Sequence, residues 1–126
     1  MEHPATLSAD LSAALDALLA AAAAAVHDLP NDDTTAVAVQ AQKAKALLDD
    51  MRDAMASANT EHIFHVLHGL NNKLTGALTL MMLAREDLAP KHPADQALAL
   101  VVARARAATD LVRAVAEAIK ARPSVT

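Results

Sequence analysis

The stretch TEHIFHVLHGLNNKLTGALTLMMLAREDL, residues 60–88, decides the fold class of this chain. Its apolar residues recur at alternating steps of four and three, the heptad pattern of a helix that buries one side. The positions on this side are Ile63, Leu67, Leu70, Leu74, Ala77, Met81, Ala84 and Leu88. Because proline is absent from the stretch, the pattern predicts one long amphipathic helix.

A second heptad segment follows after a short turn, Ala89-Pro90-Lys91-His92-Pro93. It runs from Pro93, which suits a first-turn position, to Ala121. Its apolar positions are Leu98, Val101, Ala105, Ala108, Val112, Val115 and Ile119. Because the turn is short, the two segments are expected to pack as an antiparallel hairpin over residues 60–121.

Two further helices are predicted in residues 4–58. The first runs from about Pro4 to His27 and stops where Pro30 restricts the residue before it. The second begins at Asp33 or Thr34, since both residue types are common N-caps.

The join between the second and third helices, residues 57–60, contains neither proline nor glycine. These two helices are therefore either separate or continuous. Together the segments predict a single all-α domain over residues 1–126, an antiparallel four-helix bundle. It closes either within one chain or as a homodimer of paired hairpins.

Composition excludes several classes of protein. Cysteine is absent, which removes disulfides, thiolate zinc sites and a cysteine nucleophile. Aromatic residues make up 1% of the chain and the net charge is -4, so nucleic-acid binding is not expected. The longest uncharged apolar stretch, Ala17–Val26, is too short to cross a bilayer. We therefore expect a cytoplasmic protein without a membrane partner.

Three histidines, His62, His65 and His68, lie close together in the third helix. If the heptad positions face the core, His65 and His68 fall on the outer side of the helix. The same outer strip, named here the histidine face, comprises His65, His68, Gly69, Asn72, Thr75, Gly76 and Thr79. His68 and Asn72 are four residues apart, which makes their side chains neighbours.

Gly69 and Gly76 are the two glycines of the chain. Each destabilises a helix interior by about 1 kcal/mol relative to alanine. Their spacing of one heptad puts them on the same face. Either a side chain there would obstruct a docking partner, or the glycines allow close packing on the first or second helix.

An exposed histidine on a bundle has a known chemical use. Neutral imidazole is a nucleophile near neutral pH and can accept a phosphoryl group. Two other interpretations compete. The histidines are solvated surface residues, or two ligands on one side of the helix bind a metal ion: Glu61 with His65, four residues apart, or His65 with His68, three residues apart. No further convergent ligand is identifiable, so no metal site is predicted.

The run His68-Gly69-Leu70-Asn71-Asn72-Lys73-Leu74-Thr75 resembles the phosphoacceptor motif of sensor histidine kinases. Their dimerisation and histidine phosphotransfer domain is also a helical hairpin. The resemblance implies that His68 accepts the phosphoryl group and that Asn72 orients water or phosphate. It also implies a partner, a response-regulator receiver domain or a histidine kinase. The chain would need no cofactor of its own, with Mg²⁺ on the receiver, and Gly69, Lys73, Thr75, Gly76 and Thr79 would contact the partner.

The sequence departs from that motif in two places. Gly69 stands where the family usually has an acid, and Lys73 where proline is common. The 126 residues contain no glycine-rich phosphate loop and nothing that resembles an ATP-binding domain. We therefore expect a phosphotransfer intermediate and not an autonomous kinase.

A second alignment competes with the first. His65-Val66-Leu67-His68-Gly69 resembles the His-x-x-Lys-Gly motif of histidine-containing phosphotransfer proteins, with His68 in place of lysine. This alignment makes His65 the acceptor. The longer Asn-Asn-x-Leu-Thr match favours His68.

The expected function is that of a histidine phosphotransfer protein in a two-component phosphorelay, exchanging a phosphoryl group between histidine and a receiver aspartate. One alternative is a non-catalytic protein that docks a histidine kinase or response regulator and inhibits it, or promotes dephosphorylation through Asn72. A second alternative is a structural dimerisation module.

Overall fold

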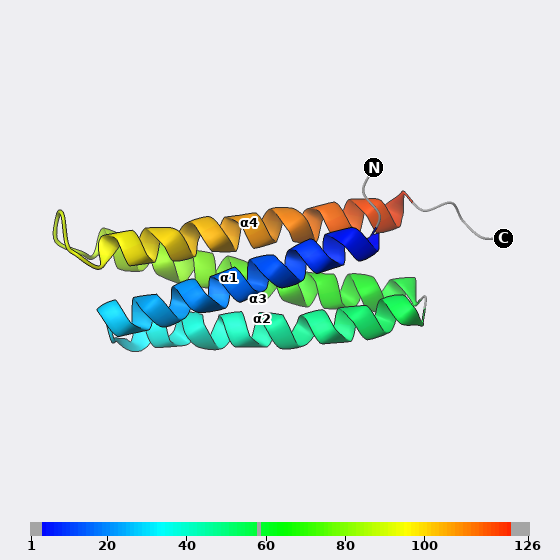
Figure 1. Ribbon diagram of the computed structural model, residues 1–126, viewed down its shortest axis with the longest axis horizontal. Coiled ribbons are helices and arrows are strands. Elements are labelled where there is room, and N and C mark those ends of the chain that lie inside the picture. Colours follow the sequence, from blue (N-terminus) through cyan, green and yellow to red (C-terminus); the bar gives the residue numbers. More distant parts are fainter. Residues whose placement is uncertain (1–3, 58, 122–126) are drawn as a thin grey trace.

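The computed structural model describes residues 4–57 and 59–121, which form a four-helix bundle (Figure 1). The helices are α1 Pro4–Asp28, α2 Asp32–Ala56, α3 Thr60–Glu86 and α4 Asp95–Lys120. Each connection turns the chain back on itself, so successive helices run antiparallel (Figure 1). The predicted all-α bundle is confirmed.

A single hydrophobic core runs between the four helices. On α3, Ile63, Leu70, Leu74 and Met81 are fully buried, as the heptad predicts. Burying each such side chain stabilises the fold by roughly 1.5–3 kcal/mol relative to leaving it exposed. The buried stripe fixes the rotation of α3 about its axis, and therefore which residues face outward.

The apolar side of the α3–α4 hairpin is covered by helices of the same chain. α1 and α3 each pack against both α2 and α4, so the helices form a closed ring around the core. Lys45 ties α2 to α1 through Asp16 (Nζ to Oδ1 2.7 Å) and Ser12 (Nζ to Oγ 2.9 Å). Closing the bundle therefore needs no second chain.

The start of α2 differs from the sequence prediction. Asn31 is the N-cap, not Asp33 or Thr34: its side chain accepts a hydrogen bond from the Thr34 N–H at 2.9 Å. Thr34 lies within the first turn, is fully buried, and donates from Oγ1 to the carbonyl of Leu29 at 2.6 Å. The expectation was wrong because the Thr34 hydroxyl satisfies the preceding turn as well as the cap.

α2 and α3 are separate helices. The Asn59 side chain accepts a hydrogen bond from the His62 N–H at 3.1 Å and so caps α3. Ala58, the last residue of the range expected for the two N-terminal helices, lies outside the described residues.

The α3–α4 connection is longer than the sequence suggested. α3 ends at Glu86, two residues before Leu88, and α4 begins at Asp95 and not in the turn that holds Pro93. His92 Nδ1 accepts a hydrogen bond from the Ala94 N–H at 3.0 Å. This bond satisfies the backbone N–H of Ala94, the residue directly before α4.

α1 is the most apolar helix. By length and composition, its segment Thr6–Asp28 would suffice to cross a membrane, although the shorter stretch considered above would not. The core helix of a soluble protein meets the same criterion. One side of α1 is buried in the bundle, with Leu11, Leu15 and Leu18 fully enclosed.

Candidate functional site

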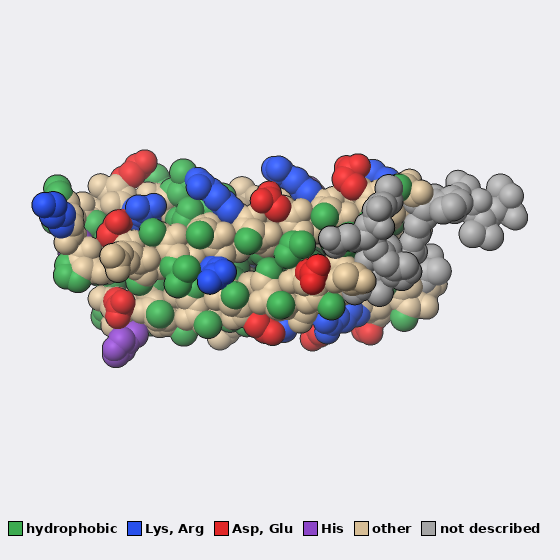
Figure 2. Space-filling model, turned by 45° about the horizontal axis from the view of Figure 1, so that its top comes forward, with side chains coloured by type: hydrophobic (Ala, Val, Ile, Leu, Met, Phe, Trp, Pro, Cys, Tyr) green, Lys and Arg blue, Asp and Glu red, His purple; other side chains and the backbone are tan. Residues whose placement is uncertain are grey.

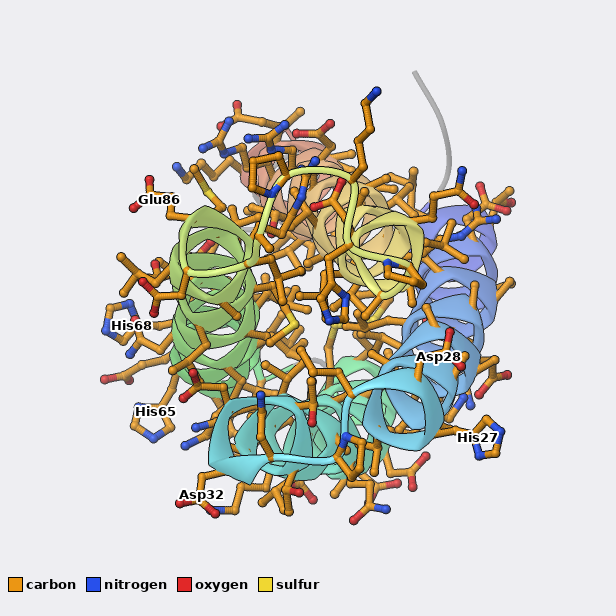
Figure 3. All side chains as sticks on the ribbon, turned by 90° about the vertical axis from the view of Figure 1, so that its left-hand side faces the viewer. His27, Asp28, Asp32, His65, His68 and Glu86 are labelled. Carbon is orange, nitrogen blue, oxygen red and sulfur yellow. The ribbon has the colours of Figure 1, made fainter. Side chains whose placement is uncertain are left out.

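The outward side of α3 carries the predicted site. His65 and His68 are exposed and project away from the bundle (Figure 3). Asn72, one turn after His68, is also exposed, as are Thr75 and Thr79. This placement follows from the heptad, because the core stripe occupies the opposite side of the helix. The roles assigned to these residues stay predictions.

The His68 imidazole is open to solvent. Within residues 4–57 and 59–121, no hydrogen bond orients its ring, whereas His92 is held by the α3–α4 turn. An unrestrained, exposed ring leaves both nitrogens accessible to an incoming group. Among the described residues, the ring also has no orienting partner of the kind that many catalytic histidines have.

His62 and His65 form a separate pair at the start of α3. Their rings are stacked, with centroids 6.3 Å apart and planes 19° from parallel. With Asn59 and Glu61 they line a shallow surface hollow of about 330 Å³. In the described part of the chain, no group of three or more His, Asp or Glu residues is arranged to hold a metal ion. The structure therefore adds no third ligand to the metal interpretation.

The two glycines of the histidine face have different surroundings. A Cβ on Gly69 would lie 3.3 Å from Cδ1 of Leu47 on α2. A Cβ on Gly76 would meet nothing within 4 Å. A side chain at position 69 would therefore require Leu47 to shift slightly, whereas one at position 76 would meet no atom within 4 Å in the described chain. The two glycines therefore need separate explanations, and their expected contact with a partner stays a prediction.

The exposed strip of α3 extends beyond the predicted histidine face. Met82 and Leu83, which lie outside the predicted histidine face, are 43% and 53% exposed. Between Glu61 and Arg85, no exposed residue of α3 carries a formal charge when histidine is neutral. Lys73, predicted to contact a partner, lies half-buried. The outer side of α3 is thus an uncharged surface that becomes more apolar toward its C-terminal end.

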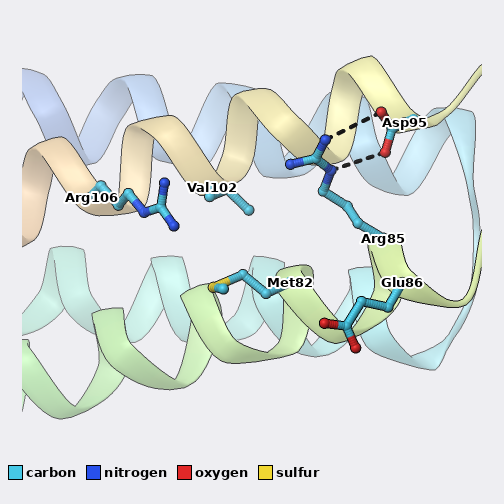
Figure 4. Close-up of a pocket in the computed structure, with 6 residues that line it drawn as sticks. All are labelled: Met82, Arg85, Glu86, Asp95, Val102 and Arg106. Atoms are coloured by element: carbon cyan, nitrogen blue, oxygen red, sulfur yellow. Dashed lines mark hydrogen bonds and ion pairs between the residues drawn. The ribbon is translucent and has the colours of Figure 1, made fainter.

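A hollow of about 320 Å³ lies beside this apolar end, between α3 and α4 (Figure 4). Arg85 donates to Asp95 from Nε (2.9 Å to Oδ1) and from a terminal nitrogen (3.3 Å to Oδ2). The hydrogen bond from Arg85 lowers the pKa of Asp95 below its ordinary value, and the pKa of Arg85 is correspondingly raised. Met82, Glu86, Val102 and Arg106 complete the lining.

α4 presents a different kind of surface from α3. Basic and acidic side chains are interspersed along it (Figure 2). The charged residues of α4 after its first turn are Arg104, Arg106, Asp110, Arg113, Glu117 and Lys120. Such mixed charge is typical of a solvated helix face and would affect the rate of association more than its strength.

Comparison with known proteins adds no family assignment. No family model, no curated protein and no solved structure matches the chain. The resemblance of residues 68–75 to the histidine kinase motif therefore stays a prediction from the sequence.

Proposed function

We propose that the chain is a histidine phosphotransfer protein, in which His68 accepts a phosphoryl group from a receiver-domain aspartate and returns it. The observation that carries this proposal is the exposed position of His68 on a helix of the bundle, with exposed Asn72 one turn away. Phosphoryl transfer requires the nucleophile, phosphorus and leaving oxygen to lie roughly in line, so the incoming group needs an uncrowded approach.

The proposed transfer uses no cofactor bound to this chain. The lone pair of one His68 nitrogen attacks the phosphorus of the acyl phosphate, a nitrogen–phosphorus bond forms, and the phosphorus–oxygen bond to the aspartate breaks. The electron pair of that bond leaves with the carboxylate. The proton on the other ring nitrogen passes to water, which reaches the exposed ring. Mg²⁺ on the receiver would hold the phosphoryl oxygens during transfer.

A direct test needs no natural partner. Phosphoramidate, a small phosphoryl donor, is incubated with the protein, and modified histidines are located by mass spectrometry and ³¹P NMR. We expect acid-labile, alkali-stable modification at His68. His65→Ala should retain the label at His68, and His68→Ala should lose the label at that position. The reverse result would make His65 the acceptor, as the second alignment implies.

The second test uses a receiver domain phosphorylated with acetyl phosphate in the presence of Mg²⁺. Label should move from the receiver to the wild-type protein but not to His68→Ala. Circular dichroism tests whether His68→Ala keeps the fold. Its spectrum should match that of the wild type because His68 is exposed. Label that persists undiminished in His68→Ala contradicts the site assignment.

A non-catalytic role is the second candidate, and the absence of a described hydrogen bond orienting His68 favours it. In this version the chain docks a receiver or a histidine kinase, and Asn72 promotes loss of phosphate. Binding would then be equal in the wild type and His68→Ala, no label would appear on the chain, and Asn72→Ala would slow dephosphorylation of the receiver. For either role we propose a cytoplasmic location.

A further inference from the structure

The start of α3 brings four polar side chains around one surface hollow. Asn59, Glu61, His62 and His65 line this hollow of about 330 Å³, and all four residues are exposed. Side chains three or four residues apart lie on the same side of a helix. His62 and His65 are three residues apart, and Glu61 and His65 are four residues apart. The helix therefore gathers two imidazoles and a carboxylate at one place.

The two imidazole rings lie close to the separation at which they could share one metal ion. Their centroids are 6.3 Å apart and their planes are 19° from parallel. Two imidazoles bound to one tetrahedral Zn²⁺ would have their centroids about 5 Å apart. The backbone N–H of His62 donates to the Asn59 cap, but within residues 4–57 and 59–121 no hydrogen bond or ion pair holds either ring. A change of side-chain conformation can therefore bring the rings together.

The structure selects this pair from the three histidines at the start of α3. By spacing alone, His65 could share an ion with either His62 or His68. The stacked rings are those of His62 and His65, and the hollow that both residues line does not include His68. A site made by His62 and His65 leaves His68 free, so it does not depend on the proposed phosphotransfer.

The charges around the hollow favour a cation. Glu61 places a carboxylate at the hollow itself. The C-terminal end of α2 lies beside the start of α3 (Figure 1). Its last two turns carry three acids and one base, which are Asp49, Asp50, Asp53 and Arg52. The free carbonyl groups at that end of α2 also oppose the positive end of the α3 dipole. A divalent ion at the hollow would therefore meet a net negative surrounding.

We propose that His62 and His65 bind one Zn²⁺ ion, with water in its remaining positions and Glu61 offsetting part of its charge. Imidazole nitrogen is a preferred ligand of Zn²⁺, whereas Mg²⁺ prefers oxygen ligands and retains its water. The site uses two protein ligands, and the described residues contain no cluster of three. Structural zinc sites are closed by four protein ligands, so this site is open and the ion exchangeable.

A zinc titration followed by NMR tests the assignment histidine by histidine. Long-range ¹H–¹⁵N spectra of the labelled protein resolve the ring nitrogens, and a bound ion shifts the rings that it contacts. We expect the rings of His62 and His65 to shift together as Zn²⁺ is added, while those of His27 and His92 stay unchanged. Mg²⁺ at the same concentration should shift none of these rings.

Calorimetry of three single variants gives the matched comparison. His62→Gln and His65→Gln each remove one ligand and should weaken Zn²⁺ binding about tenfold or more. His68→Gln removes another exposed histidine of the same helix and should bind Zn²⁺ like the wild type. Because all three positions are exposed, circular dichroism should show an unchanged fold in each variant.

Several results would overturn the proposal. One is the absence of ring shifts at His62 and His65 up to about millimolar Zn²⁺. Another is an affinity that is unchanged in His62→Gln or in His65→Gln. Equal losses in all three variants would show adventitious binding spread over the exposed histidines. The phosphoryl-transfer tests are run without Zn²⁺, so their outcome and that of the zinc titration are independent.

Discussion

Replacing each glycine of α3 by alanine should have unequal effects on stability. Gly76→Ala adds a methyl group that meets nothing within 4 Å. The full gain in helix propensity, about 1 kcal/mol, should therefore appear in the free energy of unfolding. For a chain of this size, that gain corresponds to a rise in Tm of about 3–5 °C.

Gly69→Ala should raise the free energy of unfolding by less than Gly76→Ala does. Its new methyl carbon would lie 3.3 Å from Cδ1 of Leu47, closer than ordinary van der Waals contact, so the leucine must shift. The adjustment offsets part of the propensity gain, and we expect a net change of about 0–0.5 kcal/mol. In a Leu47→Ala background the obstruction is gone, and Gly69→Ala should then stabilise by nearly the full 1 kcal/mol.

The assay is urea unfolding followed by circular dichroism at 222 nm, with all variants at the same protein concentration. The two single variants, Leu47→Ala and the double variant form a double-mutant cycle. A Gly76→Ala variant that is less stable than the wild type would contradict the expected gain. A Gly69→Ala variant that is stabilised as much as Gly76→Ala while Leu47 is present would also contradict it.

Three other expectations follow from the fold. Leu70→Ala should lower the free energy of unfolding by about 2–5 kcal/mol because Leu70 is fully buried. Leu83→Ala, at a position that is 53% exposed, should change this free energy by less than about 0.5 kcal/mol. Urea unfolding measures both changes. Lys91 has a φ of 61°, a left-handed conformation unfavourable for a residue with a side chain, so Lys91→Gly should raise the free energy of unfolding by about 0.5–1 kcal/mol in the same assay. The hydrogen bond from Arg85 lowers the pKa of Asp95, so this pair stabilises the fold at pH values above the ordinary carboxyl pKa. The stabilisation is lost as the pH falls through the lowered pKa. The difference in Tm between the wild type and Asp95→Asn should therefore be present at neutral pH and disappear in acid.

The heptad pattern was sufficient to predict the core of the hairpin. Every heptad position from Ile63 to Ala84 is buried, because the spacing of leucines and alanines fixes which side of α3 faces inward. The exposure of His68 follows from the same geometry. The predicted heptad position Leu88 lies in the turn after α3 and is only partly buried.

The helix ends were predicted less accurately than the core, because capping depends on which of several polar residues reaches a backbone N–H. Asn31, Asp33 and Thr34 are all suitable caps by type, and the choice is made by the buried bond from Thr34 to Leu29. The neighbours of Gly69 and Gly76 in the folded chain could not be predicted from the sequence either. Whether Gly69 meets α2 depends on the register between two helices, which the spacing within one helix does not determine.

The closed bundle separates stability from binding in this protein. Because α1 and α2 cover the hairpin within the same chain, the core does not depend on any partner, and substitutions on the outer side of α3 should leave the fold intact. Loss of phosphotransfer in such variants can then be attributed to the surface itself. Gly76→Ala tests both stability and binding, because alanine at this position should make the folded chain more stable. If the same variant also weakens binding, the glycine serves a contact with another molecule at a cost in helix stability.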